Sequence, residues 1–297
     1  MTLDPAALPT KDLYGLLSTA VAPRPIACAA TVDGAGRVNL SPFSYFNVFS
    51  TVPPILVFSP IRRGRDGSAK DTLANVQEVA EVTINVVNFD MVEQMSLAST
   101  EYEKGVNEFE KAGFTAVASE IVRPPRVGES PVSFECTVDQ VVPLGEGGGA
   151  GNLVVARVVR IHLDEAMLDE AGVLDTVKLD LVARMGASYY CRATPASLFE
   201  IPKPLRNMGM GVDGLPEHIR FSEVLTGNNL GRLGNLERLP EAEQLRAVSS
   251  LSEVVAARAG GRNALHRLAQ QYLERGETEK ALAVLLLELD GSSPTGQ

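Results

Sequence analysis

The sequence contains few of the residues that carry most protein chemistry. Its 297 residues include no tryptophan, three cysteines and three histidines. The cysteines are far apart and form no CxxC pair, which predicts buried thiols at Cys28, Cys136 and Cys191. The histidines are equally scattered, and no Ser-His-Asp or Cys-His arrangement stands out. We therefore expect no zinc or iron centre and no catalytic nucleophile.

Long apolar runs and an excess of positive charge are also missing. No run approaches the roughly 18 to 20 apolar residues needed to cross a bilayer, and the N-terminus lacks the basic start of a secretory signal. The formal charge of −10 would repel an extended nucleic-acid backbone, but it leaves room for a basic pocket that holds one phosphate group. We expect a cytoplasmic protein that binds neither nucleic acid nor membrane.

The residues that are present predict a mainly β fold with short helices. Apolar residues make up 45% of the chain, which is enough for a substantial core. Runs rich in β-branched residues, typical of strands, occupy 26–32, 53–59, 81–88, 132–144 and 152–165. Short helices are expected near 13–20, 71–79 and 90–99, and the glycine cluster 145–151 predicts a hairpin loop. Strands with glycine-rich turns indicate a barrel or a sandwich.

The C-terminal third of the chain has a different pattern. Residues 202–216 are rich in proline and glycine, and helical periodicity follows them. We expect a first domain over 1–205, and over 206–297 a linker with a small appendage of two or three antiparallel helices. The expected apolar stripes are Leu245, Val248, Leu251 and Val255; Leu265, Leu268, Tyr272 and Leu273; and residues 279–290. Their apolar faces could pack on the barrel, pack on each other or bind a partner.

Two short segments in the first domain suggest a ligand. Ser41-Pro42-Phe43-Ser44 places hydroxyls beside an aromatic ring, and Lys70-Asp71-Thr72 opens a helix after an arginine-containing loop. A helix N-terminus with a lysine suits a phosphate. Each segment alone has a structural explanation, a bent strand at a barrel edge or a helix capped by Asp71 or Thr72. Together they suit a ligand with a flat ring and a phosphate tail.

Three longer stretches resemble one protein family. Residues 22–60, 70–87 and 182–192 resemble the flavin reductase-like family of FMN-binding split barrels, which includes flavoredoxins and the reductase components of two-component monooxygenases. The resemblance covers about residues 10–203 and leaves the helical tail outside. It implies a Greek-key split β-barrel that is usually a homodimer, with FMN held near the subunit interface.

The resemblance also assigns roles to individual residues. Ser41 would lie near the phosphate or ribityl chain, and Lys70 and Thr72 would hold the phosphate, with Asp71 capping or orienting. Further residues implied around the isoalloxazine and along the site are Pro42, Phe43, Ser44, Asn47 and Ser59. Arg184 and Tyr189 lie where the family has an Arg-x-Gly-Gly segment, although Ala187 replaces the second glycine and Tyr189 could instead belong to the barrel packing.

The function implied by the resemblance is reduction of FMN by NADH or NADPH. Hydride passes directly from nicotinamide to flavin, so positioning matters more than protein acids and bases. Since no GxGxxG follows a strand, the nicotinamide would bind transiently over the flavin. Reduced flavin or electrons would pass to a partner monooxygenase or redox protein. The alternatives are an FMN-binding electron carrier without multiple-turnover flavin reduction, and an interaction module formed by the helical tail.

Overall fold

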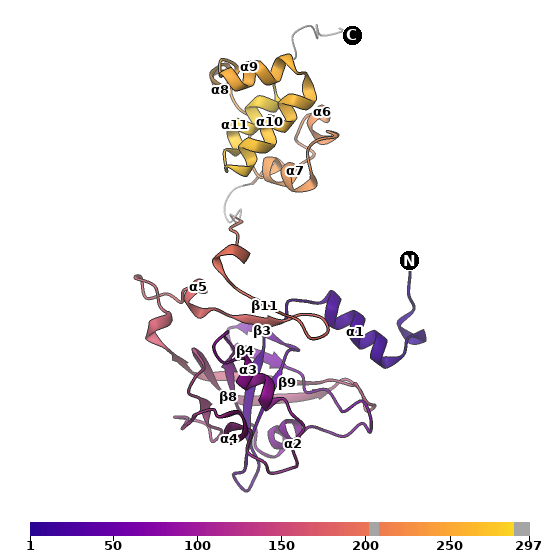
Figure 1. Ribbon diagram of the computed structural model, residues 1–297, viewed down its shortest axis with the longest axis vertical. Helices are drawn as coiled ribbons and strands as arrows, with labels where there is room; N and C mark the ends of the chain where they lie inside the picture. The colour runs from indigo at the N-terminus through magenta and orange to yellow at the C-terminus, as the bar shows by residue number, and fades with distance from the viewer. Residues whose placement is uncertain (202–207, 288–297) are drawn as a thin grey trace. The chain divides into compact units, whose positions relative to one another are not determined.

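The protein is described by a computed structural model that covers residues 1–201 and 208–287 (Figure 1). Contacts divide the chain into two compact units, Met1–Phe199 and Glu200–Gln297. The boundary predicted between residues 205 and 206 lies outside the described residues. Within the described part, no helix is long and apolar enough to span a membrane.

The first unit is built on one antiparallel sheet. Its order is β2-β1-β5-β8-β9-β4-β3. The strands are β1 (Ala27–Val32), β2 (Val38–Phe43), β3 (Phe46–Thr51), β4 (Pro54–Phe58), β5 (Glu81–Val86), β8 (Val132–Pro143) and β9 (Asn152–Leu163). Two smaller pairs are β6 (Ala116–Val117) with β7 (Arg126–Val127), and β10 (Val182–Arg184) with β11 (Tyr190–Arg192). The pairing of β8 with β9 confirms the hairpin loop predicted at 145–151.

The connection from β2 to β3 curls this sheet into an open barrel. These strands form the two opposite edges of the sheet, yet only Ser44 and Tyr45 separate them. Three Cα–Cα steps span at most about 11 Å, so the two edges must come close together at this point. We call the place where these two edges meet the seam, and Ser41-Pro42-Phe43-Ser44 lies along it. The predicted split barrel is confirmed.

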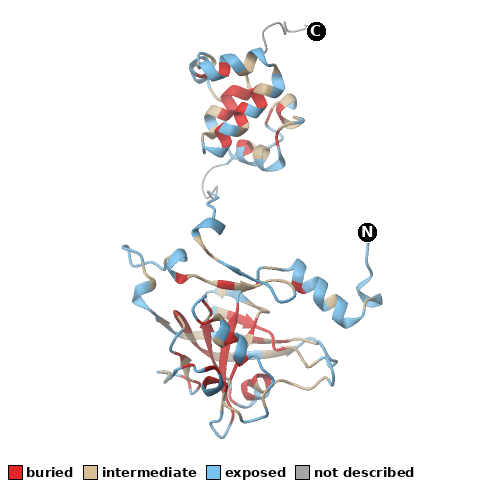
Figure 2. Ribbon diagram, viewed as in Figure 1, coloured by how far each residue is buried: buried red, intermediate tan, exposed pale blue. Residues whose placement is uncertain are grey.

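The core lies on both faces of β1. Ala27 and Ala29 face a cluster that includes Phe58 and Ile84, while Cys28 and Ala30 face a cluster that includes helical side chains such as Met95. All six residues of β1 are buried, and Figure 2 shows the buried strands at the centre of this unit. The small side chains allow the sheet and its covering helices to approach closely.

Short helices surround the sheet, as predicted. They are α1 (Thr10–Ala20), α2 (Asp71–Glu78), α3 (Val92–Ala98), α4 (Glu108–Ala112) and α5 (Thr176–Leu179), with 3₁₀ turns η1 (Pro5–Ala7), η2 (Glu165–Met167) and η3 (Pro195–Ser197). Helix α2 packs against β1 and β2, and α3 and α4 pack together against β2. This arrangement brings the start of α2 and the end of α3 to the seam side of β2.

The second unit has its own helical core. Its helices are α6 (Glu217–Arg220), α7 (Gly227–Gly234), α8 (Ala242–Ser249), α9 (Ser252–Ala259), α10 (Arg262–Glu274) and α11 (Thr278–Leu285). The expected number of two or three was too low for the described residues. The stripe through Leu265 and Tyr272 is buried as predicted. The prediction that Leu245, Val248, Leu251 and Val255 form one stripe was wrong, since α8 ends before Leu251 and Val255 is 56% exposed.

Candidate functional site

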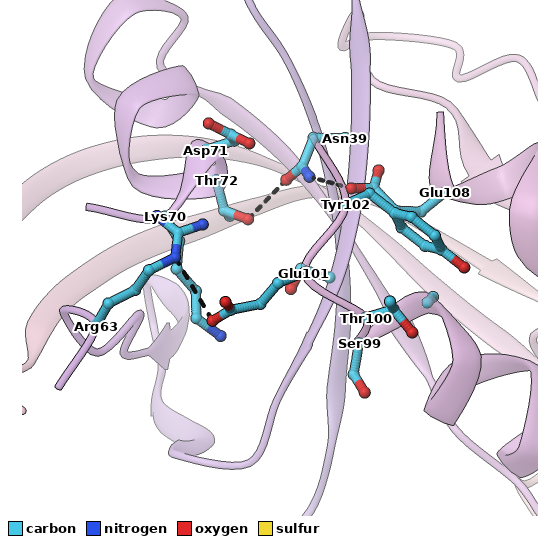
Figure 3. A pocket seen from close by; sticks show the side chains of 12 residues that line it. Asn39, Arg63, Lys70, Asp71, Thr72, Ser99, Thr100, Glu101, Tyr102 and Glu108 are labelled. Carbon is cyan, nitrogen blue, oxygen red and sulfur yellow. Dashed lines mark hydrogen bonds and ion pairs between the residues drawn. The ribbon is translucent and has the colours of Figure 1, made fainter. Parts of the chain in front are cut away.

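A small cavity joins the two segments that the sequence singled out. Its lining combines β2, the start of α2 and the segment after α3 (Figure 3). The lining residues are Asn39, Ser41, Arg63, Lys70, Asp71, Thr72, Ala98, Ser99, Thr100, Glu101, Tyr102 and Glu108. The cavity measures about 40 Å³. One water molecule needs about 10–15 Å³, so the cavity accommodates a phosphate-sized group and not a whole flavin.

The N-terminus of α2 faces this cavity without a side-chain cap. Lys70 occupies the N-cap position with an extended backbone, and no side chain accepts a hydrogen bond at the cap. The alternative explanation, a helix capped by the side chain of Asp71 or Thr72, therefore does not hold. Asp71 is the first helical residue, and the Thr72 hydroxyl points to another partner. The first backbone amides of α2 thus retain the capacity to bind an anion.

Lys70 supplies a positive charge at the same place. Its Nζ lies 5.3 Å from the centroid of the Phe43 ring, within the range of a cation–π contact. Burial lowers the pKa of Lys70, the positive charge of Arg63 lowers it further, and Glu101 opposes the shift. Within the described residues, Lys70 has no carboxylate at salt-bridge distance. A lysine that is partly desolvated and unpaired in this way is suited to an anionic ligand.

A buried carboxylate orients the Thr72 hydroxyl through one intermediate residue. Glu108 Oε2 accepts a hydrogen bond from the Leu40 amide at 2.9 Å, and Oε1 accepts one from Asn39 Nδ2 at 2.9 Å. The Asn39 amide then presents Oδ1 to Thr72 Oγ1, which donates to it at 2.7 Å (Figure 3). Burial raises the pKa of Glu108, although the hydrogen bonds oppose that shift. Asn39 and Glu108 were missed by the sequence reasoning.

The remaining residues of the serine segment lie along the seam. Phe43 is buried and packs against Phe58 with ring centroids 5.3 Å apart, so it belongs to the core as well as to the edge of the site. Ser44 lies 3.4 Å from Arg24 Nε. The Arg24 guanidinium also donates to Met185 O at 3.1 Å, which ties Ser44 to the turn that follows β10. Arg24 is a buried cation that the sequence reasoning did not identify.

Like Pro42, Phe43 and Ser44, four more predicted residues do not line this cavity. Asn47 is exposed on β3, and its Oδ1 accepts from the neighbouring Val48 amide. Ser59 is buried and accepts from the Asn152 amide at 3.0 Å, a contact that joins β4 to β9. Arg184 stacks over the Tyr190 ring at 4.6 Å, and Tyr189 is 75% exposed. The structure does not bring these four residues together with Lys70.

The turn after β10 contains an alanine in a backbone conformation that normally favours glycine. Ala187 has a φ of 50°, in the left-handed region that favours glycine. This is the position where the sequence departs from the Arg-x-Gly-Gly pattern. The backbone therefore keeps a glycine-like conformation there in spite of the methyl group.

A second, more apolar cavity of about 230 Å³ lies beside β11. Its lining residues are Phe89, Val92, Glu93, Ser96, Val182, Tyr190, Cys191 and Arg192. Cys191 is exposed, so the expectation of a buried thiol was wrong for this residue, because β11 lies at the surface. Cys28 and Cys136 are buried, and burial raises the pKa of each thiol to about 12.

Comparisons with known proteins define first the fold and then the family. The crystal structure of nitrilotriacetate monooxygenase component B from Bacillus cereus is similar to this chain with a TM-score of 0.63 and 29% identity, over 68% of this chain and 98% of that one. The 2-nitrobenzoate 2-nitroreductase of Pseudomonas fluorescens gives a TM-score of 0.58 and 26% identity, over 70% of this chain and all of that one. The split barrel domain of a Shewanella frigidimarina protein is also similar, with a TM-score of 0.57 and 25% identity, over 68% of this chain and 99% of that one. The fold of the first unit is a split β-barrel.

The family follows from the sequence itself. Residues 19–181 match the model of the flavin reductase like domain. An uncharacterised protein of Halalkalibacterium halodurans is 38% identical over 192 residues, which are 64% of this chain and 91% of that protein. The chain belongs to the flavin reductase-like family, as the resemblance implied.

Proposed function

We propose that the protein is an FMN-dependent oxidoreductase that uses NADH or NADPH to reduce flavin. The observation that carries this proposal is the shared cavity of Ser41, Lys70 and Thr72 at the uncapped start of α2. A phosphate-sized anion fits the cavity by volume, and Lys70 and the first backbone amides of α2 offer it hydrogen-bond donors. Membership of the flavin reductase-like family supports flavin as the group that carries this phosphate.

The residues of the cavity would act as holders of the phosphate end. Lys70 would contribute its ammonium group, and the first turn of α2 would contribute backbone amides. Ser41 would add a hydroxyl from β2. Glu108 and Asn39 would keep Thr72 in place through their hydrogen bonds. When bound, flavin accepts a hydride from reduced nicotinamide at its ring nitrogen N5.

The seam residues are the part of the site proposed to support the flavin ring. Ser44 follows Ser41 along the same edge of the barrel, and Arg24 connects it to the turn that carries Tyr189. We assign Pro42, Phe43 and Ser44 to the ring end, with Asn47 at its pyrimidine edge, and Arg184 and Tyr189 to the opposite wall. Hydride transfer requires the protein to position the two rings and does not require a protein acid or base.

A homodimer is part of the proposal because the first unit exposes two apolar surfaces. The large exposed side chains on α1 and β3 are Tyr14, Leu16, Leu17, Val48 and Phe49. Large apolar side chains exposed together on one element are typical of an interface. Sedimentation velocity at micromolar concentration checks this, and a species with the mass of one chain would contradict it.

Turnover separates a reductase from an electron carrier. With FMN in large excess over protein, a reductase oxidises many equivalents of NADH or NADPH per chain, whereas a carrier stops after its own flavin is reduced. The similarity to a monooxygenase component supports a partner oxygenase or redox protein as the recipient of reduced flavin. Failure to oxidise either nicotinamide in the presence of FMN would overturn the proposed reductase.

A further inference from the structure

The cavity already contains a negative group that competes for its positive charges. Glu101, on the segment between α3 and α4, points toward Arg63 and Lys70 (Figure 3). Its Oε1 lies 3.6 Å from Arg63 Nε, and its Oε2 lies 3.2 Å from Arg65 Nη1. A carboxylate thus lies at the place where a phosphate would meet these cations.

The contact with Arg63 is an incomplete one. Arg63 Nη1 donates hydrogen bonds to Ala69 O at 2.8 Å and to Ser68 Oγ at 3.2 Å. These bonds stabilise the loop that leads into α2. Its Nε is shielded from solvent and has no hydrogen-bond partner, because 3.6 Å is too long for such a bond. Glu101 therefore offsets the charge of Arg63 but leaves its Nε–H without a hydrogen bond. An anion that lay closer would accept that hydrogen bond.

The balance of charge in the cavity does not favour a phosphate as it stands. The lining contains two cations, Arg63 and Lys70, and three carboxyl groups, those of Asp71, Glu101 and Glu108. Glu108 cannot leave, because it is buried and hydrogen-bonded at both oxygens. Asp71 points away from Glu101 in Figure 3. The side chain of Glu101 is 56% exposed. It can leave the cavity by rotation into water.

We propose that Glu101 is an internal competitor of the flavin phosphate and that the segment 99–104 releases it when the phosphate binds. The inference rests on the proposed function, since it assigns a role within the same site. Arg63 and Arg65, which contact Glu101 in the free protein, would contact the phosphate in the complex. Part of the binding free energy is then used to break the contacts of Glu101, so phosphorylated flavin is held loosely enough to exchange.

The variant Glu101→Gln tests this with two flavins. Glutamine keeps the shape and removes the charge, so the dissociation constant of FMN should fall about fivefold, which corresponds to an exposed ion pair of this kind. Riboflavin lacks the phosphate, and its dissociation constant should not change. Glu103→Gln is the matched control, because Glu103 is exposed on the same segment and does not line the cavity. It should leave both constants as they are.

Hydrogen exchange gives an independent readout. Adding FMN should speed amide exchange over residues 99–104 in the wild-type protein, and adding riboflavin should not. The inference is overturned if FMN binds and Glu101→Gln leaves its affinity unchanged or weakens it, or if Glu103→Gln improves it equally. In those cases the proposed function stands. If the wild-type protein binds neither flavin, the proposed function fails and this inference fails with it.

Discussion

Replacing Lys70 by methionine removes the positive charge that we propose lies against the flavin phosphate. Methionine keeps an unbranched stem of similar length, so the packing against Phe43 is largely retained. The ammonium group is partly desolvated and has no carboxylate partner at salt-bridge distance among the described residues. A charge-assisted hydrogen bond in such a place contributes about 1.5–3 kcal/mol. The dissociation constant of FMN should therefore rise about tenfold to a hundredfold.

The assay is a fluorescence titration of FMN and of riboflavin against wild type, Lys70→Met and Lys104→Met. Lys104 is exposed and does not line the cavity, so its variant controls for the loss of one positive charge. We expect Lys70→Met to weaken FMN alone and Lys104→Met to change neither ligand. An equal loss for FMN and riboflavin would refute the assignment of Lys70 to the phosphate. So would an unchanged affinity for FMN.

Two further predictions concern stability. Ala187→Gly should raise the free energy of unfolding by about 1 kcal/mol, because Ala187 has a left-handed backbone, whereas Ala183→Gly in β10 should lower it by about 0.5–1 kcal/mol; equal effects in urea unfolding would contradict this. Burial lowers the pKa of His266 to about 4, so the unfolded chain binds a proton first and the second unit should lose stability as the pH falls from about 6.5 to about 4. His266→Gln should flatten that dependence in thermal unfolding, and an unchanged slope would show that other groups cause it.

The pH prediction has a structural basis in the His266 environment. The Ser222 hydroxyl accepts from the Val224 and Leu225 amides, so its own proton is directed to His266 Nδ1 at 2.6 Å. The neutral ring then carries its proton on Nε2, which is buried and has no hydrogen-bond partner. A second proton would have no acceptor in this core. The stability of the unit is therefore complete only above the ordinary pKa of histidine.

Local patterns were sufficient for most of the elements of the fold. Runs of β-branched residues predicted β1, β4, β5, β8 and β9, and the glycine cluster predicted their longest hairpin. The periodic pattern of apolar residues did not predict a helix boundary that no glycine or proline marks. The stripe from Leu245 to Val255 continues in sequence through Leu251, but the chain turns there and separates α8 from α9. Nothing in the spacing of those leucines marks the turn.

The site was predictable where it depended on residue type and not where it depended on distant contacts. Ser41, Lys70 and Thr72 were identified because hydroxyls, a lysine and a helix start are typical of phosphate binding. Glu108 acts on Asn39 from 69 residues away, and only the packing of α4 against β2 brings them together. Glu101 gave no signal either, since a single acidic residue in a loop is ordinary in a chain with 37 of them.

The position of the phosphate in a complex with FMN is the most direct measurement of the central claim. A crystal structure of the protein with FMN should place the phosphate between Lys70 and the first amides of α2, within hydrogen-bond distance of Ser41 or Thr72. Glu101 should then point into solvent. A phosphate found elsewhere, including the cavity beside β11, would contradict the account.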